Sequence, residues 1–280
     1  MLLPGIVYVG PIPLRTAVRI PYLLLLLVLL CGPAPGGPSQ PVGSDAIFQA
    51  STISALMAGL DDGDMTFGQL RRHGDFGLGT LDALDGEMVA LDGTFYQVRA
   101  DGRVYRVPDA MRTPFAAVKW FRPERTIPLP TASSLAELER MLDAAIASPN
   151  VCTAIRVEGR FDRVTTRSVP RQTKPYPPLV AAAKAQKTFA LRNVVGTMVG
   201  FRTPEYMAGL NVPGYHFHFL TADRRAGGHV LACSVRQARA GLDSALSLDV
   251  RLPTTPEFAR ADLAGQSRQD LDRVEGAGGE

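Results

Sequence analysis

The sequence predicts an α/β protein of the α+β type, in which antiparallel sheet dominates and a few helices are interspersed. Three observations predict this class: short alternating apolar runs, Asp-Gly pairs between them, and one clear amphipathic helix. Hydrophobic residues make up 46% and charged residues 20% of the 280 residues, which is ordinary for a globular protein. This length suffices for one large domain or two smaller ones, and we expect a division around residues 125–150.

The N-terminal segment has the composition of a signal peptide. Arg15 and Arg19 precede the apolar run "PYLLLLLVLLC", which is too short to span a bilayer, and the Pro/Gly/Ser-rich "GPAPGGPSQPVGS" follows. We therefore expect export to the periplasm or the extracellular space, with Cys31 as a candidate lipid anchor. An uncleaved anchor and a misassigned start codon are alternatives, and a cytoplasmic location is the alternative to export.

Two short segments after the linker carry helix signals. "DAIFQASTISALMAGL" has helical spacing, and Gly59 near its end fits a C-terminal stop. In "TFGQLRRHG", Thr66 followed by Gln69 three residues later makes a capping-box signal, and Gly74 closes the segment. Both segments are therefore predicted to contain helix.

The next part of the chain reads as an antiparallel meander. Short apolar runs are separated by Asp85-Gly86, Asp92-Gly93 and Asp101-Gly102, and Asp-Gly favours the left-handed backbone of tight hairpins. Residues 133–148 then form an amphipathic helix with one apolar face. The residues of that face are Leu135, Leu138, Met141, Leu142 and Ile146.

Strands resume in the second half. "CTAIRVEGRFDRVTTRSV" is interpreted as a hairpin that turns at Gly159, and "PLVAAAKAQKTFAL" as a stretch with a short helix. Further strands are predicted in "VVGTMVGFRTP", "GYHFHFLT", "GHVLACSVRQA" and "ALSLDVRLP". The tail from Glu257 is predicted to be helical in part.

Charge and cysteine usage exclude some classes. The net charge is +3 with scattered Lys and Arg, so no basic block indicates nucleic-acid binding. The three cysteines form no CxxC pair, which argues against a cysteine-based zinc site. Cys152 and Cys233 form either one disulfide or two buried free thiols. We find no glycine-rich phosphate-binding loop followed by a helix.

The histidines are concentrated in one place. Of four in the chain, His216, His218 and His229 lie in "GYHFHFLTADRRAGGH", and only His73 lies elsewhere. Alternate side chains on a strand share a face, so His216 and His218 point the same way and Phe217 and Phe219 point to the core side. A hairpin through "ADRRAGG" brings His229 beside His218. Three imidazoles then converge, as a metal ion requires.

Spacing alone leaves the chemistry of such a site open. Surface or hydrogen-bonded histidines are the alternative to a metal site. An HxH strand also occurs in cupin-type metal oxygenases and isomerases, but that pattern expects a glutamate shortly afterwards, where this chain has Asp223. A structural zinc in an exported protein is a third interpretation, and it predicts a closed site without an open coordination position. The residues therefore indicate a mononuclear metal site, and carboxylates are its natural further ligands or proton carriers.

Four motifs together resemble the alpha-acetolactate decarboxylase family. They are "GDFGLGTLDALDGEMVALDGTFYQV" (74–98), "EGRFDRVTTRSV" (158–169), "GTMVGFRTPEY" (196–206) and "GYHFHFLTADRRAGGHVL" (214–231). They occur in the family's order and spacing, and the resemblance runs from about residue 48 to the C-terminal region.

The resemblance implies roles for particular residues. The HxH pair and the later histidine would bind zinc, Glu87 would approach the metal, and Glu275 would complete the site. Arg167 matches the family's catalytic arginine, and Thr80 matches a pocket threonine. Without the resemblance, Glu87 is better interpreted as a solvated residue after a hairpin turn, and Arg167 and Thr80 can be interpreted as a surface charge and an ordinary residue on strands. Three other acids compete with Glu275 in the tail: Asp270, Asp272 and Glu280.

The resemblance also implies an activity and an architecture. The family converts 2-acetolactate to acetoin and carbon dioxide with zinc and no organic cofactor, and it is usually dimeric. Its fold has a mixed-sheet domain and an antiparallel domain, with the C-terminal tail packing back on the first. For this chain that implies residues 44–148 as the mixed-sheet domain and 149–280 as the antiparallel domain with the histidines and the tail. The composition of the N-terminal segment assigns residues 1–43 to the signal peptide and linker.

Overall fold

The computed structural model describes residue 10 and residues 45–265 and 267–275. The predicted signal peptide, its linker and the candidate lipid anchor Cys31 lie outside these residues. In the described part of the chain, no helix is long and apolar enough to cross a membrane. Export and anchoring therefore stay predictions from the sequence.

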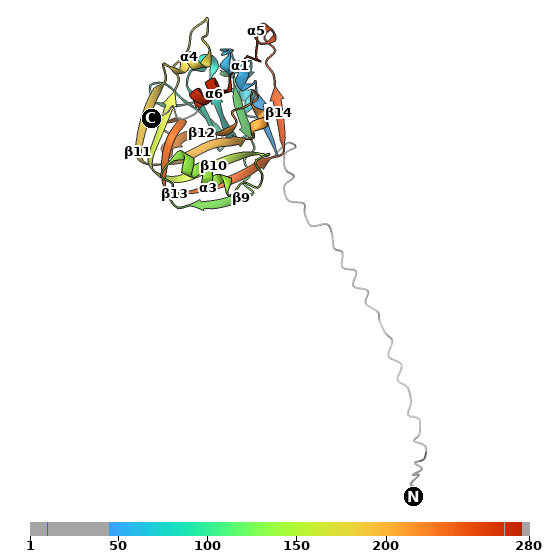
Figure 1. The fold of residues 1–280 in the computed structure, drawn as a ribbon, viewed down its shortest axis with the longest axis vertical. Coiled ribbons are helices and arrows are strands. Elements are labelled where there is room, and N and C mark those ends of the chain that lie inside the picture. Colours follow the sequence, from blue (N-terminus) through green and yellow to red (C-terminus); the bar gives the residue numbers. More distant parts are fainter. Residues whose placement is uncertain (1–9, 11–44, 266, 276–280) are drawn as a thin grey trace, which may run out of the picture. The chain divides into compact units, whose positions relative to one another are not determined.

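A seven-stranded mixed sheet forms one layer of the fold (Figure 1). Its order is β14-β1-β8-β3-β4-β5-β6, with β1 parallel to β14 and every other neighbouring pair antiparallel. The strands are β1 (Ala46–Ala50), β3 (Phe76–Thr80), β4 (Glu87–Leu91), β5 (Thr94–Val98), β6 (Val104–Arg106), β8 (Ala116–Lys119) and β14 (Ser247–Arg251). The predicted meander is confirmed as β3-β4-β5-β6. A separate two-stranded sheet pairs β2 (Met65–Thr66) with β7 (Arg112–Thr113).

The three Asp-Gly pairs make two kinds of connection. Asp92 and Gly93 join β4 to β5 with φ values of 51° and 74°, as a tight hairpin requires. Gly102 also has positive φ between β5 and β6. Before Asp85-Gly86, however, Ala83 and Leu84 have positive φ as well. This connection from β3 to β4 is a longer, buried turn that ends directly at Glu87.

The second sheet is antiparallel and curls into a small closed barrel. Its order is β10-β11-β12-β13-β9, and β10 also pairs with β13, which closes the ring. The strands are β9 (Arg125–Leu129), β10 (Cys152–Ser168), β11 (Lys187–Thr203), β12 (Gly214–Thr221) and β13 (Gly227–Ala245).

The hairpin predicted at Gly159 is wrong, because β10 runs through this residue without turning. Gly159 pairs with Gly196 on β11 and with Ala238 on β13. A Cβ at this position would lie 2.2 Å from the backbone oxygen of Gln237. The glycine is therefore needed for close strand packing, and sequence alone does not distinguish that need from a turn.

Short helices complete the fold. They are α1 (Ile53–Met57), α2 (Phe67–Leu70), η1 (Asp82–Leu84), α3 (Leu135–Asp143), α4 (Leu179–Ala183), η2 (Glu205–Met207), α5 (Pro256–Arg260) and α6 (Arg268–Glu275). The helix predicted over the whole of "DAIFQASTISALMAGL" is half wrong. Its first part is the buried strand β1, which ends at Ala50. Ser51 then has a positive φ of 64°, and α1 begins only after the Thr52 cap.

Several other helix predictions are confirmed. Thr66 and Gln69 form a reciprocal capping box at α2, and α3 lies within the predicted 133–148 segment. The short helix α4 lies in the stretch predicted for it, and the tail contains α5 and α6. The tail packs back as expected, because Leu271 and Val274 of α6 share an apolar cluster with Ile53 and Leu56 of α1.

Four apolar clusters hold the layers together. One fills the barrel beneath α3, a second lies between the two sheets, and a third covers the outer face of the seven-stranded sheet. The fourth joins α1, η1, α4 and α6, and Figure 1 shows α1, α4 and α6 gathered at one end, away from α3. Each of the two larger sheets includes one strand from the other side of the predicted 148/149 boundary. The barrel includes β9, which precedes the boundary, and the seven-stranded sheet includes β14, which follows it. The two-domain division stays a prediction.

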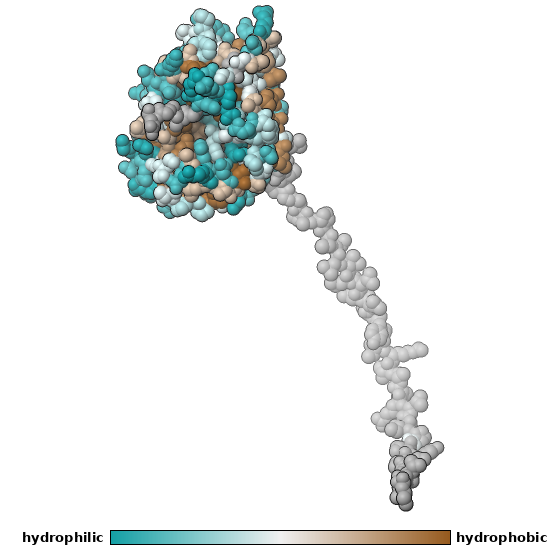
Figure 2. All heavy atoms as spheres, viewed as in Figure 1, coloured by the Kyte–Doolittle hydropathy of each residue, from teal (hydrophilic) through white to brown (hydrophobic). Residues whose placement is uncertain are grey.

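Cys152 and Cys233 are free and buried, so the structure favours the thiol alternative over a disulfide. The Cys152 Sγ lies 3.2 Å from the Sδ of Met207. On the surface, Figure 2 shows apolar residues along the edge that carries β14, and Leu246 and Leu252 beside that strand are exposed. No partner chain is present, so the predicted homodimer stays a prediction.

Candidate metal centre and active-site pocket

Strand β12 presents two different faces. Phe217 and Phe219 point into the barrel cluster, as predicted. His216 and His218 point the other way, toward the seven-stranded sheet, where Leu220 on the same face belongs to the inter-sheet cluster. The alternation of a strand therefore places both imidazoles between the two sheets.

The turn after β12 brings the third histidine into register. His218 pairs directly with His229 on β13, as the predicted hairpin requires. Cβ atoms at Gly227 and Gly228 would lie 2.3 Å from the Phe219 oxygen and 2.4 Å from the Arg167 oxygen. Both glycines are thus needed for close backbone approach beside the histidines. The register between β10 and β13 shifts next to this point, after which Arg167 pairs with His229.

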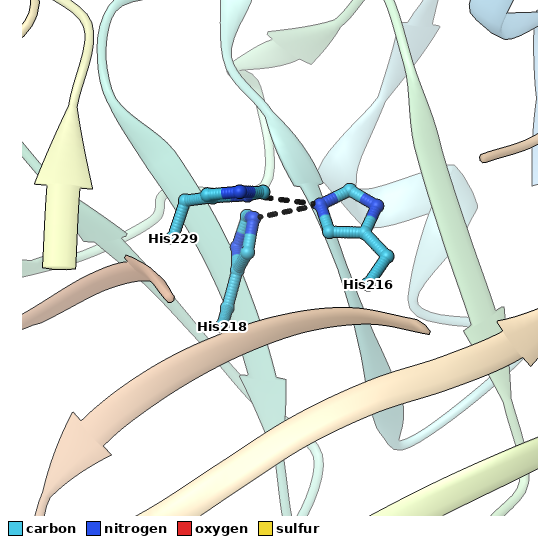
Figure 3. Close-up of side chains that lie close together, drawn as sticks. All are labelled: His216, His218 and His229. Carbon is cyan, nitrogen blue, oxygen red and sulfur yellow. Dashed lines mark hydrogen bonds between the residues drawn. The ribbon is translucent and has the colours of Figure 1, made fainter. Parts of the chain in front are cut away.

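The three imidazoles converge on one point (Figure 3). His216 Nε2 lies 3.3 Å from His218 Nε2 and 3.2 Å from His229 Nδ1. One nitrogen from each ring lies within 4.8 Å of the others, and all three residues are buried. The predicted cluster therefore exists as a compact set of nitrogen donors.

The outer nitrogens fix the orientation of two rings. His218 Nδ1 donates to the Met88 carbonyl at 2.8 Å, and His229 Nε2 donates to the Glu275 carbonyl at 3.3 Å. His218 Nε2 and His229 Nδ1 then carry lone pairs, whereas the outer Nδ1 of His216 is buried without a hydrogen-bond partner among the described residues. Burial lowers the pKa of His216 to about 3 and the pKa values of His218 and His229 well below their usual range, and the Arg167 charge acts in the same direction. The imidazoles are therefore neutral at physiological pH.

This arrangement fits a divalent metal ion. The lone pairs of His218 Nε2 and His229 Nδ1 both point toward His216 Nε2, at 3.3 and 3.2 Å, and a cation in this space would satisfy all three nitrogens. Nitrogen ligands about 2.0–2.1 Å from a tetrahedral zinc ion are separated by about 3.3–3.4 Å, which is close to the observed spacing. The hydrogen bonds from the outer nitrogens are of the kind that orients metal-bound histidines.

Two glutamates reach the same point from opposite ends of the chain. Glu87 Oε2 lies 3.6 Å from His218 Nε2, and Glu275 Oε2 lies 3.4 Å from His216 Nε2. Burial raises the pKa of Glu87 to about 7 and also raises the pKa of Glu275, while Arg167 opposes both shifts. The Glu275 Oε2 atom is buried and has no hydrogen-bond partner among the described residues. An unpartnered carboxylate oxygen beside three imidazoles is a natural metal ligand.

The acids that competed with Glu275 in the sequence are occupied elsewhere or lie outside the described residues. Asp270 forms an ion pair with Arg273, and Asp272 forms one with Arg268. Glu280 lies outside the described part of the chain. Helix α6 therefore directs Glu275, rather than either aspartate, toward the histidines.

Arg167 is a buried cation beside the cluster. Its Nη2 lies 3.8 Å from Glu275 Oε1, and its Nη1 donates to Gln186 Oε1 at 3.4 Å. Its Nε is buried without a hydrogen-bond partner among the described residues. Such a donor is costly unless a ligand satisfies it, so the guanidinium is arranged to receive an anion.

Thr80 acts on the turn that carries Glu87. Its Oγ1 donates to the Gly86 carbonyl at 2.8 Å, and Thr80 pairs with Glu87 across β3 and β4. The Gln97 side chain holds the Asp85 carbonyl of the same turn. Thr80 lines the pocket, and its hydrogen bond to the Gly86 carbonyl indicates that it positions Glu87.

The polar groups line one pocket. Its other lining side chains include six apolar residues from the cluster of short helices and adjoining segments, which together are called the apolar wall. They are Ile53, Leu56, Leu84, Phe115, Val169 and Leu179. This wall, Gln186 and the Met88 carbonyl were not predicted from the sequence, because apolar, amide and backbone groups carry no local signal of a site.

The family comparison agrees with this geometry. The family model described as alpha-acetolactate decarboxylase matches residues 47–265. The chain belongs to the alpha-acetolactate decarboxylase family. The resemblance inferred from the four motifs is thereby confirmed.

Similar proteins and structures cover most of the chain. The alpha-acetolactate decarboxylase of Methanosarcina mazei is 47% identical over 83% of this chain and 81% of its own length. That of Methylococcus capsulatus is 46% identical over 84% and 92%. A crystal structure of alpha-acetolactate decarboxylase from Bacillus subtilis aligns with a TM-score of 0.81 and 38% identity, over 82% of this chain and 99% of that one. The two-layer fold is therefore the one of the alpha-acetolactate decarboxylase family.

All seven residues that the resemblance singled out lie around one pocket in this alpha-acetolactate decarboxylase family member. They are Thr80, Glu87, Arg167, His216, His218, His229 and Glu275. Six of them lie within the matched region, and Glu275 lies beyond it. The structure brings the residues together, and their roles are taken up as a proposal below.

Proposed function

We propose that this protein is a zinc-dependent carboxy-lyase that converts 2-acetolactate to acetoin and carbon dioxide, as part of acetoin biosynthesis. The observation that carries the proposal is the convergence of three neutral imidazoles, two glutamates and an unsatisfied arginine on one pocket. The family membership supports the same reaction.

The reaction breaks the bond between the carboxylate carbon and C2 of the substrate. The electron pair of that bond moves into a new double bond between C2 and the ketone carbon, and negative charge appears on the ketone oxygen. Protonation at C2 then gives acetoin. When bound by His216, His218 and His229, with Glu275 as a further ligand, zinc supplies a Lewis acid that stabilises negative charge on oxygen.

Arg167 orients the substrate and stabilises charge. Its planar guanidinium suits a carboxylate, and its buried Nε is available for one. Before bond cleavage it holds the leaving carboxylate. When the carboxylate leaves as neutral carbon dioxide, its negative charge remains on the developing enediolate. The same arginine donor lies beside this charge. Gln186 and Glu275 hold the guanidinium in place.

Glu87 is the proton donor in this proposal. The backbone N–H of Val169 contacts its carboxyl group, and the turn held by Thr80 fixes its backbone. A donor fixed on one side of the pocket protonates C2 from one face and so sets the configuration of acetoin. The apolar wall opposite excludes water, which strengthens the electrostatic interactions within the pocket.

The test is acetoin release from racemic 2-acetolactate by the purified protein. We expect release to stop after chelator treatment and to return when zinc is added back. A folded, zinc-loaded protein that releases no acetoin would refute the proposed reaction. Activity that survives complete metal removal would refute the zinc dependence alone.

The two alternative functions make different predictions. A cupin-like oxygenase requires O₂ and a redox-active metal, whereas acetoin release under anaerobic conditions with zinc requires neither. A structural zinc needs no pocket beside it, yet here the histidines and Arg167 line one pocket. Export to the periplasm or outside the cell, and a homodimer, are further proposals, to be tested by fractionation of cells and by light scattering.

A further inference from the structure

We propose that Leu179, the first residue of α4, sets the length of alkyl group that the pocket accepts on the substrate. This inference rests on the proposed decarboxylation of a 2-hydroxy-3-keto acid and adds a specificity-determining residue to it. The assignment of Leu179 comes from the residues that line the pocket.

The residues that line the pocket form a polar group and an apolar group. Its polar side comes from strands β3, β4, β10, β12 and β13 and from the end of α6. Its apolar side belongs to the cluster that joins α1, η1, α4 and α6. A bound substrate must match this division, because an oxygen against the apolar wall would lose its hydrogen bonds.

The substrate has the same two kinds of group. Its carboxylate, hydroxyl and ketone oxygens match Arg167, the histidines and the glutamates. Its remaining substituents are two methyl groups, one on C2 and one on the ketone carbon. With the oxygens on the polar side, these alkyl groups face the apolar wall, and the wall limits how long they are.

Two of the six wall residues also contact the polar side through their backbones. The Val169 N–H contacts the Glu87 carboxyl group, and the Phe115 carbonyl accepts from the Thr80 N–H at 3.0 Å. Substitutions at these two positions would disturb the reaction itself.

Of the other wall residues, Leu84 has a positive φ of 54°, so its conformation is coupled to the turn that ends at Glu87. Ile53, Leu56 and Leu179 share one apolar cluster with the helix that carries Glu275. Leu179 starts a helix in ordinary geometry and is 4% exposed. It is also the one of these three whose connection contacts Arg167, through Gln186.

The connection between β10 and β11, which carries Leu179, is held by hydrogen bonds before and after α4. Before α4, the Gln172 N–H donates to the Ala83 carbonyl at 2.7 Å, and Tyr176 Oη donates to Asp62 Oδ1 at 2.9 Å. After α4, Gln186 accepts from Arg167. The leucine is thus held at a fixed position relative to the guanidinium that binds the carboxylate. Because Leu179 lies at a fixed distance from the group that binds the carboxylate, it limits the length of the alkyl group that the substrate can have.

The experiment compares substrates that differ at C2. The methyl compound is 2-acetolactate, and the homologues carry ethyl and propyl groups in place of that methyl. We expect Leu179→Ala to raise kcat/KM for the propyl homologue relative to the methyl compound by at least about tenfold, because each methylene in an apolar pocket changes kcat/KM by about 10- to 200-fold. Leu179→Phe should lower the same ratio for the ethyl homologue.

A ratio of kcat/KM values does not depend on the fraction of folded enzyme, and Leu179→Val offers a milder variant. Met57→Ala is the matched control, because Met57 belongs to the same apolar cluster but does not line the pocket. It should leave the ratio unchanged. If Leu179→Ala and Leu179→Val decarboxylate 2-acetolactate but leave the ratio as in the parent, Leu179 does not set alkyl length. If the parent protein decarboxylates none of the compounds, the proposed function itself fails.

Discussion

The two sides of the pocket are held by very different structures. His216, His218, His229 and Arg167 lie on three strands, β10, β12 and β13, which all belong to the closed barrel. The apolar wall rests on short elements such as α1, η1 and α4, none longer than five residues, joined mainly by apolar contacts.

This difference suggests that the strands determine the reaction and that the apolar wall determines which substrate is accepted. In a closed barrel, a register change in one strand moves all of its side chains, so the polar residues depend on one another's backbones. A short helix at the end of a connection tolerates a change of side chain more readily. We therefore expect substitutions on the strands to change whether the reaction occurs, and substitutions on the wall to change stability or which substrate reacts.

The strongest test of the strand-built side is His218→Ala. It should remove both bound metal and turnover, with a loss of at least about 10³-fold, because the metal supplies several kcal/mol of charge stabilisation. Metal analysis and acetoin release measure the two effects. His73→Ala is the matched control, since this histidine stacks on Phe48 outside the site and its loss should spare the metal. A His218→Ala protein with full zinc and activity would contradict the ligand assignment.

Arg167→Ala sharpens the comparison by separating metal binding from turnover. The metal content should stay near that of the parent, while kcat/KM falls by about 10²- to 10³-fold, as for loss of a charge-stabilising donor. Arg163→Ala on the same strand is exposed and should be nearly silent. Loss of metal in Arg167→Ala would show that the arginine supports the metal centre and not only the substrate.

A substitution at Asp61 tests how the segment beside the apolar wall contributes to the free energy of unfolding. It is fully buried next to the turn of η1, where its carbonyl accepts from the Ala83 N–H, and its carboxylate oxygens have no partner among the described residues. Burial raises its pKa from 3.8 to about 7, and neighbouring Asp62 and Asp82 add to the effect. The folded state therefore holds a proton that the unfolded state has lost between about pH 4 and pH 7.

It follows that the stability contributed by Asp61 falls as pH rises through this window. Asp61→Asn should remove the decline and raise the free energy of unfolding at pH 9 by about 2 to 4 kcal/mol. Urea unfolding at pH 5, 7 and 9 measures it, with exposed Glu257→Gln as the control. An unchanged pH dependence in Asp61→Asn would show that the carboxyl group is ionised in the folded protein.

Thr80→Val is expected to have the smallest effect. It leaves the buried Gly86 carbonyl without the Thr80 hydroxyl, at a cost of about 1–3 kcal/mol in stability. Turnover should fall by about tenfold, because Glu87 directly follows the loosened carbonyl. Thr80→Ser should restore both properties. Failure of serine to restore turnover would show that the threonine methyl group, rather than the hydrogen bond, matters in the pocket.

Local patterns in the sequence predicted the histidine cluster well. His216, His218 and His229 lie close in the chain, and strand alternation with one hairpin suffices to bring them together. Glu87, Arg167 and Glu275 come from three distant segments, so no local rule connects them to the histidines. Only the resemblance to a family placed them at the site.

The errors in the fold have the same origin. Gly159 looked like a turn because the need for close packing arises from Gly196 and Ala238, which lie far away in sequence. The helix predicted over β1 failed because its apolar residues are buried between β14 and β8, and β14 is contributed by the far end of the chain. Pairing with β14 on one edge of β1 and with β8 on the other overrode the local helical spacing.

The position of Glu275 has a consequence for biosynthesis. A chain grows from its N-terminus at about 5–20 residues per second, so the three histidines leave the ribosome before the glutamate does. A chain that ended before α6 would lack the carboxylate that lies 3.4 Å from His216, and it would also lack Leu271 and Val274 of the apolar cluster shared with α1. The pocket lined by the histidines is therefore complete only once α6 has been synthesised.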